Sequence, residues 1–394
     1  MAKNIPYLFS GVLVVSSILV IPNLTHIKDR FFFSHATNLS EELILKINED
    51  KKKSSTIEVC KGLELALPLI GCDYKWDVEG AATYCIPSLQ GVDVALITND
   101  RQISIYPVAA VGIQPQEAFA WGFKVFGAYH LVNRFWKIKT EYNYYKNIVN
   151  SNLKLSYGQG FVPSAYSNSA VDNLPFSSSI FANLELGNYT LLNNLRISLS
   201  RPSFITPNLE ITTLFGFDAN FLQRRQISVF TNAVNDTVSS GFVSALGGFF
   251  QNYQKYTWWG VGPSLGIQTC WNLGGNFYFQ YHAYGDITYG PSTMRTATFA
   301  KRVIAGPPTL TYQAQEAAVQ NSMTQFAPSM RYLVGIDYRY LFESKKTQLD
   351  LEIAYETQYY FNVIRTLVPE GSFRSENGAG FGLQGLVLQA RIIF

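Results

Sequence analysis

The feature that most constrains this chain of 394 residues is an alternation of apolar and polar residues with a period of two. Successive side chains of a β-strand point to opposite faces, so this pattern predicts one apolar face and one wet face. From residue 348 onward the two faces are formed by Leu349, Leu351, Ile353, Tyr355, Tyr359 and Phe361, and by Gln348, Asp350, Glu352, Glu356 and Gln358. Three carboxylates on one face would disrupt a dry sandwich core, so the pattern favours a hydrated lumen or a solvent-facing surface.

The preceding segment, residues 331–342, alternates in the same way, and a polar turn at 343–347 joins the two. This arrangement predicts an antiparallel hairpin. Both segments span about ten or more residues, as a tilted membrane crossing requires, whereas strands of soluble proteins usually have about five or six. The length of the alternation therefore favours a barrel in a membrane over a soluble sandwich.

The register of this hairpin has two plausible solutions, in which Arg339 opposes either Asp350 or Glu352. Each solution pairs a guanidinium with a carboxylate across the two strands. We favour Glu352 as the partner, because Asp337 then faces Ala354 instead of a second carboxylate.

Composition supports the membrane assignment. After the N-terminus there is no apolar run of roughly 18 residues, which a transmembrane helix would need. Charged residues make up only 15% of the chain, against about a quarter in soluble proteins. Aromatic residues gather at the ends of the alternating segments, as at Trp259, Trp271 and Tyr289, which is typical of the girdles at the two interfaces of a membrane barrel.

The N-terminus predicts export. Lys3 is followed by an apolar stretch at 7–21 and by Ser34-His35-Ala36, which has small residues at the two positions that a signal peptidase reads. We expect a signal peptide at residues 1–36, with an earlier cut or an uncleaved anchor as the alternatives. A polar periplasmic extension follows at 37–79.

Residues 80–394 are predicted to form one all-β domain, a transmembrane antiparallel β-barrel of about 12 strands, with 10 to 16 as the range. Short turns are expected at one end. Two long polar loops are expected at the other end, near 150–178 and 291–326. The glycines of segment 260–266 are not followed by a helical pattern, so they indicate tight curvature or aromatic packing in the barrel wall, not a nucleotide site.

Several segments together resemble the Legionella-type family of major outer membrane proteins, which are pore-forming barrels that also occur in chlamydia-related bacteria. The matching segments are Trp121-Gly122-Phe123-Lys124-Val125, residues 136–142, residues 195–218, residues 259–266, the hairpin at 331–361 and Leu383-Gln384-Gly385-Leu386. The final strand ends at Phe394, which resembles the signal by which the barrel-assembly machinery recognises its substrates. Residues 37–89 do not match the family pattern.

These features together predict a porin of the bacterial outer membrane, in contact with lipid, through which small hydrophilic solutes and ions diffuse passively. The residues expected to line the pore are Lys137, Lys139, Glu141, His282, Asp286, Asp337, Arg339, Asp350, Glu352, Glu356, Gln389 and Arg391. Neither sign of charge dominates among them, so weak ion selectivity is expected. The near-neutral chain has no basic face for nucleic acid, and no residue pattern predicts a cofactor, a metal or an enzymatic activity.

Two alternatives remain open. Cys60, Cys72, Cys85 and Cys270 would lie in an oxidising compartment, and a structural barrel cross-linked through them to envelope proteins or to another copy of the chain is one alternative. An outer-membrane hydrolase is the other, since His282 and Asp286 share one wet face. No serine elbow or metal-ligand set accompanies them, so we favour a polar histidine of the lumen.

Overall fold

The computed structural model describes residues 76–89, 94–98, 110–131, 136–155, 159–163, 181–233, 249–306, 309–342, 347–368 and 375–394. The predicted signal peptide and nearly all of the predicted extension lie outside these residues, as do Cys60 and Cys72. Within the described ranges, no helix has the length and apolar character needed to span a bilayer.

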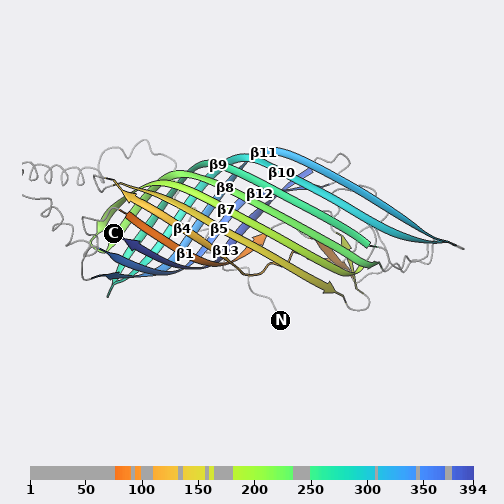
Figure 1. Cartoon of the computed structure of the whole chain (residues 1–394), viewed down its shortest axis with the longest axis horizontal. Helices are drawn as coiled ribbons and strands as arrows, with labels where there is room; N and C mark the ends of the chain where they lie inside the picture. Colours follow the sequence, from red (N-terminus) through yellow and green to blue (C-terminus); the bar gives the residue numbers. More distant parts are fainter. Residues whose placement is uncertain are drawn as a thin grey trace, which may run out of the picture. The chain divides into compact units, whose positions relative to one another are not determined.

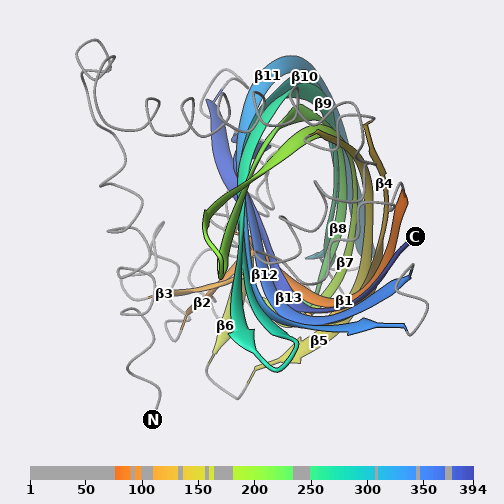
Figure 2. The same ribbon diagram turned by 90° about the vertical axis from the view of Figure 1, so that its left-hand side faces the viewer.

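The described chain is a single antiparallel sheet that closes on itself (Figure 1 and Figure 2). Its strands are β1 (Trp76–Leu89), β2 (Ala95–Thr98), β3 (Ala110–Ile113), β4 (Ala120–His130), β5 (Lys137–Lys154), β6 (Gly160–Pro163), β7 (Phe181–Thr206), β8 (Leu209–Ala233), β9 (Phe249–Gly274), β10 (Phe277–Gly306), β11 (Thr309–Leu341), β12 (Gln348–Val368) and β13 (Ser375–Ile393).

Ten of these strands form the ring, in the order β1, β4, β5, β7, β8, β9, β10, β11, β12 and β13. The pairing of β1 with β13 closes it, from Asp77 opposite Ile393 to Leu89 opposite Phe381. The short strands β2, β3 and β6 are added outside the ring, where β6 pairs with the start of β7. The all-β antiparallel barrel is therefore confirmed, and the ring itself sits at the lower limit of the predicted range.

The two ends of the barrel differ. At one end the strands are joined by tight connections such as Pro207-Asn208 and Gly275-Asn276, the second of which has positive φ angles of 61° and 70°. The last residue, Phe394, exchanges backbone hydrogen bonds of 3.0 Å with Trp76 at this end. Because outer-membrane barrels have short periplasmic turns, we assign this end to the periplasm.

The faces follow the predicted alternation. Outward residues of β9 include Trp259, Leu265 and Trp271, which are all more than half exposed, while the residues that alternate with this outward set, such as Trp258 and Ser264, point inward. Trp259 and Trp271 are separated by 12 positions, which is about 30 Å along the axis of a tilted barrel and matches the apolar band of an outer-membrane protein. The aromatic girdles are therefore present, and the chain contacts lipid through this band.

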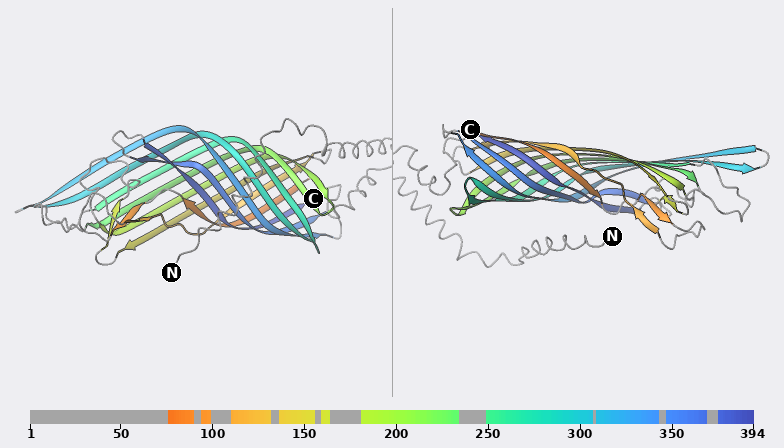
Figure 3. Two further views of the ribbon diagram at one scale, coloured as in Figure 1. Left: turned by 180° about the vertical axis from the view of Figure 1, so that it is seen from behind. Right: turned by 90° about the horizontal axis from the view of Figure 1, so that it is seen from below.

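The prediction of a polar loop at 291–326 is wrong. Strands β10 and β11 continue through this region as one long hairpin, with pairs that run from Pro291 opposite Thr324 to Gly306 opposite Thr309. The hairpin projects well beyond the neighbouring strands (Figure 1 and Figure 3). Its buried face carries Ser292, Thr296 and Thr298, and its outer face carries Thr293 and Arg295. Polar residues therefore occur on both faces, so no apolar alternation marks this hairpin in the sequence. In the other predicted loop, β5 extends to Lys154 and β6 occupies 160–163, while 164–180 lie outside the described residues.

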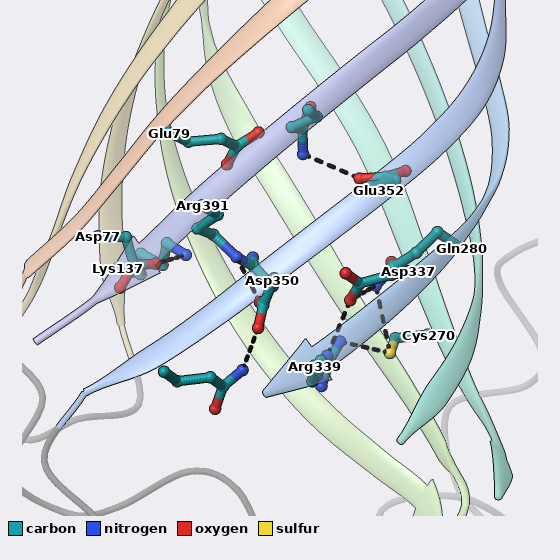
Figure 4. A network of polar contacts seen from close by, with 12 residues as sticks. Asp77, Glu79, Lys137, Cys270, Gln280, Asp337, Arg339, Asp350, Glu352 and Arg391 are labelled. Atoms are coloured by element: carbon teal, nitrogen blue, oxygen red, sulfur yellow. Dashed lines mark hydrogen bonds and ion pairs between the residues drawn. The ribbon is translucent and has the colours of Figure 1, made fainter. Parts of the chain in front are cut away.

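The favoured register of the 331–361 hairpin is also wrong, and the other register that we considered is present. Arg339 opposes Asp350, and Asp337 opposes Glu352. Each of the two facing carboxylates accepts a hydrogen bond from a glutamine on a strand outside the hairpin, which the hairpin pattern does not reveal. Asp337 accepts hydrogen bonds from Arg339 Nε at 2.9 Å and from Gln280 at 3.3 Å, while Glu352 accepts one from Gln389 at 2.8 Å (Figure 4).

The assignment of the lipid-facing and inward faces of β12 can be tested by substitutions in the barrel wall. Ile353 is 56% exposed to lipid, while Gln389 on the neighbouring strand points inward at nearly the same depth. We expect Ile353→Lys to lower the free energy of unfolding by about 2 to 4 kcal/mol, the usual cost of a lysine at mid-membrane on the lipid face. Gln389→Lys should have a much smaller effect, because its ammonium group replaces the amide donor to Glu352. Denaturant titrations of refolding into vesicles measure both, and equal penalties would contradict the assignment of faces.

Candidate functional site

The barrel interior is the candidate functional site, because its wall carries nearly all the described charged side chains of the membrane-spanning part. All the predicted pore-lining residues point into it: Lys137, Lys139, Glu141, His282, Asp286, Asp337, Arg339, Asp350, Glu352, Glu356, Gln389 and Arg391. The alternation positions them, since each lies one residue away from a lipid-facing neighbour.

At the periplasmic end the inward charges form local pairs (Figure 4). Asp77 on β1 is bridged by Lys137 and by His130, whose Nε2 lies 3.0 Å from the carboxylate. Arg391 on β13 donates to Asp350 from Nε at 2.8 Å. The pairs of Asp77 with His130 and of Asp350 with Arg391 join neighbouring strands of the ring, whereas the pair of Asp77 with Lys137 spans the intervening strand β4. Together they leave little unpaired charge at this mouth of the barrel.

Deeper in the barrel the pairs cross the lumen. Glu141 on β5 forms a buried ion pair with Arg331 on β11, and these two strands lie opposite each other in the ten-stranded ring. Lys124 on β4 pairs with Glu356 on β12, three strands away around the ring. The interior is therefore narrow enough at this level for side chains from opposite walls to meet.

An aromatic ring organises the two central arginines. Tyr284 on β10 lies between Arg196 and Arg331, whose guanidinium carbons are 4.4 and 4.7 Å from its centroid. Arg196 also makes a bidentate ion pair with Asp218, with N–O distances of 2.7 and 2.5 Å. Guanidinium groups stack on aromatic faces and fork onto carboxylates at once, which a lysine ammonium would not do.

The glycines of segment 260–266 make room for this packing. A Cβ at Gly266 would lie 2.5 Å from the Tyr284 ring, and one at Gly260 would lie 2.8 Å from the Trp258 ring. Both aromatic side chains lie over the inner wall of β9 at these positions. The predicted role of the glycines in aromatic packing is therefore confirmed.

Toward the extracellular end, apolar and aromatic side chains fill the lumen. Trp258 and Tyr360 are fully buried with their rings 6.2 Å apart, and the Tyr360 hydroxyl donates to Asn220 across the barrel at 3.0 Å. Tyr145 and Phe381 belong to the same buried cluster. This layer narrows the interior above the central charges.

The segment before β4, residues 114–119, lies against the inner wall at this end. Asn147 donates to the carbonyl of Ala118 at 2.8 Å, and Arg224 forms an ion pair of 3.2 Å with Glu117. Burial raises the pKa of Glu117 above its ordinary value, although Arg224 acts in the opposite direction. Residues 114–119 thus fold inward and narrow the barrel.

The two described cysteines are free thiols on the inner face. Cys85 is buried within the apolar layer, while Cys270 lies near the periplasmic end and accepts hydrogen bonds from Arg339 at 2.9 Å and Gln280 at 3.5 Å. The predicted disulfides of Cys60 and Cys72 lie outside the described residues. Neither Cys85 nor Cys270 presents its sulfur to the outer surface of the barrel.

The structure places His282 and Asp286 on the same inner face, but in separate surroundings. His282 packs edge-on against Tyr284, with centroids 6.1 Å apart, and Asp286 accepts a hydrogen bond from Ser329. In the described part of the chain, no group of three or more histidines, cysteines or acids is placed to hold a metal ion.

Several inward charges were missed by the sequence reasoning, namely Asp77, Glu79, Lys124, Arg196, Asp218, Arg224 and Arg331. Asp77 and Glu79 were assigned to the extension, although β1 already begins at Trp76. Their alternation with Trp76 and Val78 is the signal that would have found them.

The Glu141–Arg331 pair gives a second test. Removing one partner of a buried ion pair leaves an uncompensated charge and typically costs about 3 to 5 kcal/mol. We therefore expect Arg331→Met to destabilise the barrel by this amount, and the double variant Glu141→Gln/Arg331→Met to recover most of it. Arg201→Met, at an exposed cation of the outer face, serves as the control. Unfolding titrations should distinguish these three variants. If Arg331→Met lowers the free energy of unfolding no more than Arg201→Met does, burial of the ion pair is contradicted.

Several solved structures are similar to this chain. Among solved structures, the chain is similar to the outer membrane protease OmpT of Escherichia coli, at 9% identity over 82% of this chain and 98% of that one, with a TM-score of 0.35. It is also similar to the toluene transporter TodX of Pseudomonas putida, at 10% identity over 84% of this chain and 92% of that one, with a TM-score of 0.26. A FadL homologue of Pseudomonas aeruginosa is similar at 10% identity over 81% of this chain and 90% of that one, with a TM-score of 0.22.

Curated protein sequences gave no significant match. The family model described as Legionella pneumophila major outer membrane protein precursor matches residues 71–394, which include every strand of the barrel. The chain therefore belongs to this family of bacterial outer membrane proteins.

Proposed function

We propose that the protein is a narrow channel for passive diffusion of small hydrophilic solutes and ions, with the Glu141–Arg331 bridge at its constriction. The observation that carries this proposal is the inner face itself. Charged and polar side chains line it from Asp77 at the periplasmic mouth to Arg196 at the centre, and they recur at Arg224 beside the apolar layer that contains Trp258. Such a lining is costly to keep in a barrel whose interior has no contact with water.

The side-chain contacts in the centre of the lumen can break while the barrel wall stays intact. The Glu141–Arg331 bridge is formed by side chains alone, between walls that are held independently by backbone pairing. Side-chain rotamers move much faster than strands separate, so water and ions could pass when the bridge and the side chains of the apolar layer around Trp258 move apart, without any change in the fold. Cations and anions occur in similar numbers along the wall, which supports weak selectivity among small solutes.

Particular contacts argue against the two alternative functions, which are cross-linking of envelope proteins and hydrolysis. Cross-linking of envelope proteins through Cys270 would require a thiol on the outside, whereas this sulfur faces the lumen beside Arg339. Hydrolysis through His282 and Asp286 would require a nucleophile beside them, and Ser329 donates to Asp286 without a contact to His282. We therefore propose a channel without enzymatic activity.

Planar-bilayer recordings of the refolded protein test the channel directly. We expect discrete conductance steps with weak selectivity. Arg331→Gln should increase the conductance, because it removes the cationic half of the bridge, and Arg331→Glu should shift the reversal potential toward cations. Arg201→Gln, on the outer face, should change neither. A folded protein without conductance steps, or an Arg331→Glu variant with unchanged selectivity, would overturn the proposal.

Thiol chemistry separates the channel from the cross-linked alternative. A small, charged, thiol-reactive reagent added from the periplasmic side should reduce conductance, because Cys270 lies on the inner wall near that mouth. Cys270→Ser should be insensitive, while Cys85→Ser should behave as the parent protein. If native envelopes instead show slower bands on non-reducing gels that vanish in Cys270→Ser, the cysteine acts in cross-linking and our assignment of it is wrong.

A further inference from the structure

The outer wall of the barrel carries a row of cations above the upper aromatic girdle, and nothing in the channel uses them. Arg225 on β8 opposes Lys255 on β9, and Lys255 opposes Arg295 on β10. All three point outward, because the residues on either side of each are buried in the interior. We call Arg225, Lys255 and Arg295, with Lys146 on β5, the basic row.

The row continues toward β5 through an aromatic residue. Tyr189 on β7 opposes Arg225, whose guanidinium carbon lies 5.3 Å from the ring centroid. The ammonium group of Lys146 approaches the same ring at 5.8 Å. Four cations thus follow one another across β5, β7, β8, β9 and β10, which are neighbours in the ring.

This arrangement is unfavourable unless an anion joins it. Directly opposed like charges on neighbouring strands destabilise a sheet, and here three cations stand side by side at roughly 5 Å between Cβ atoms. On the outward faces of these five strands, Glu185 is the single carboxylate among the side chains that the structure describes. None of the four cations forms an ion pair with another described residue.

The height of the row indicates what that anion is. Lys255 lies four residues beyond Trp259, and Arg295 lies six beyond Tyr289, on the side away from the periplasmic turns. At about 3.3 Å per residue and a tilt of about 40°, this places the row roughly 10 to 15 Å above the girdle. Headgroups of the outer leaflet occupy that zone, since the girdle marks the edge of the hydrocarbon.

We propose that the basic row binds the phosphorylated headgroups of the outer-leaflet glycolipid, lipopolysaccharide. Several phosphates on one rigid headgroup suit several cations in a line, and the guanidinium groups of Arg225 and Arg295 can each hold a phosphate through two parallel hydrogen bonds. The lipid-facing surface below the row would hold the acyl chains of the same molecule. The row would thereby order the lipid around this side of the barrel.

The test compares the triple variant Arg225→Gln/Lys255→Gln/Arg295→Gln with the parent barrel. Binding is measured to phosphatidylcholine nanodiscs that contain bisphosphorylated lipid A, to nanodiscs with dephosphorylated lipid A, and to inorganic pyrophosphate alone. Since a cation near an anionic membrane surface contributes roughly a fivefold preference, we expect the triple variant to bind bisphosphorylated lipid A about tenfold to hundredfold more weakly. The parent should discriminate against the other two probes.

The control removes two other exposed cations of the outer wall, in the variant Lys154→Gln/Arg201→Gln. It should bind lipid A as the parent does, and heat-modified migration on gels should show that all variants fold. Equal binding by the triple variant and the parent would overturn the proposal, as would an equal loss in the control. Pyrophosphate bound as tightly as lipid A would also overturn it, because the row would then be a free-phosphate site. No outcome depends on channel activity.

Discussion

Everything in this barrel depends on the closure of β1 against β13. Inside a bilayer no water is present to satisfy a free strand edge, so a membrane-spanning sheet is stable only when its first and last strands pair. Here the pairing extends along nearly the whole of β1 and ends with the mutual hydrogen bonds of Trp76 and Phe394. Closure defines an inside and an outside, and the period-two alternation then assigns every side chain to one of them.

The small number of strands determines what the inside can contain. A barrel of eight strands has an interior just wide enough for side chains to fill, and ten strands widen it only modestly. Glu141 can therefore reach Arg331 from the opposite wall, and Tyr284 fits only because Gly266 has no side chain beneath its ring. In so narrow an interior a lone buried charge would be costly, so cations and carboxylates occur together.

The sequence predicts the parts of this structure that depend on local periodicity. The apolar and wet faces of 349–361 and the inward direction of the proposed pore residues follow from alternation alone. The register of that hairpin does not, because Asp337 and Glu352 accept hydrogen bonds from Gln280 and Gln389, which come from strands outside it. The cross-lumen partners are likewise inaccessible, since Glu141 and Arg331 are 190 residues apart. The extension of β10 and β11 was missed because both of its faces carry polar residues, such as Thr296 on the inner face and Thr293 on the outer face.

The distribution of charge between the two faces follows from their different surroundings. The whole chain carries a formal charge of only +3. This small net value conceals a strong segregation of charged side chains between the inner and outer faces of the barrel. Carboxylates gather inside, where most of them are paired with a nearby cation, while Glu352 and Asp286 accept hydrogen bonds from Gln389 and Ser329. The outer wall above the girdle keeps unmatched cations, such as Lys255 and Arg295, and a solvated surface beside anionic headgroups allows this. One alternating pattern thus builds two electrostatic environments, a balanced interior suited to small solutes of either sign and a basic exterior suited to the phosphates of the membrane that surrounds it.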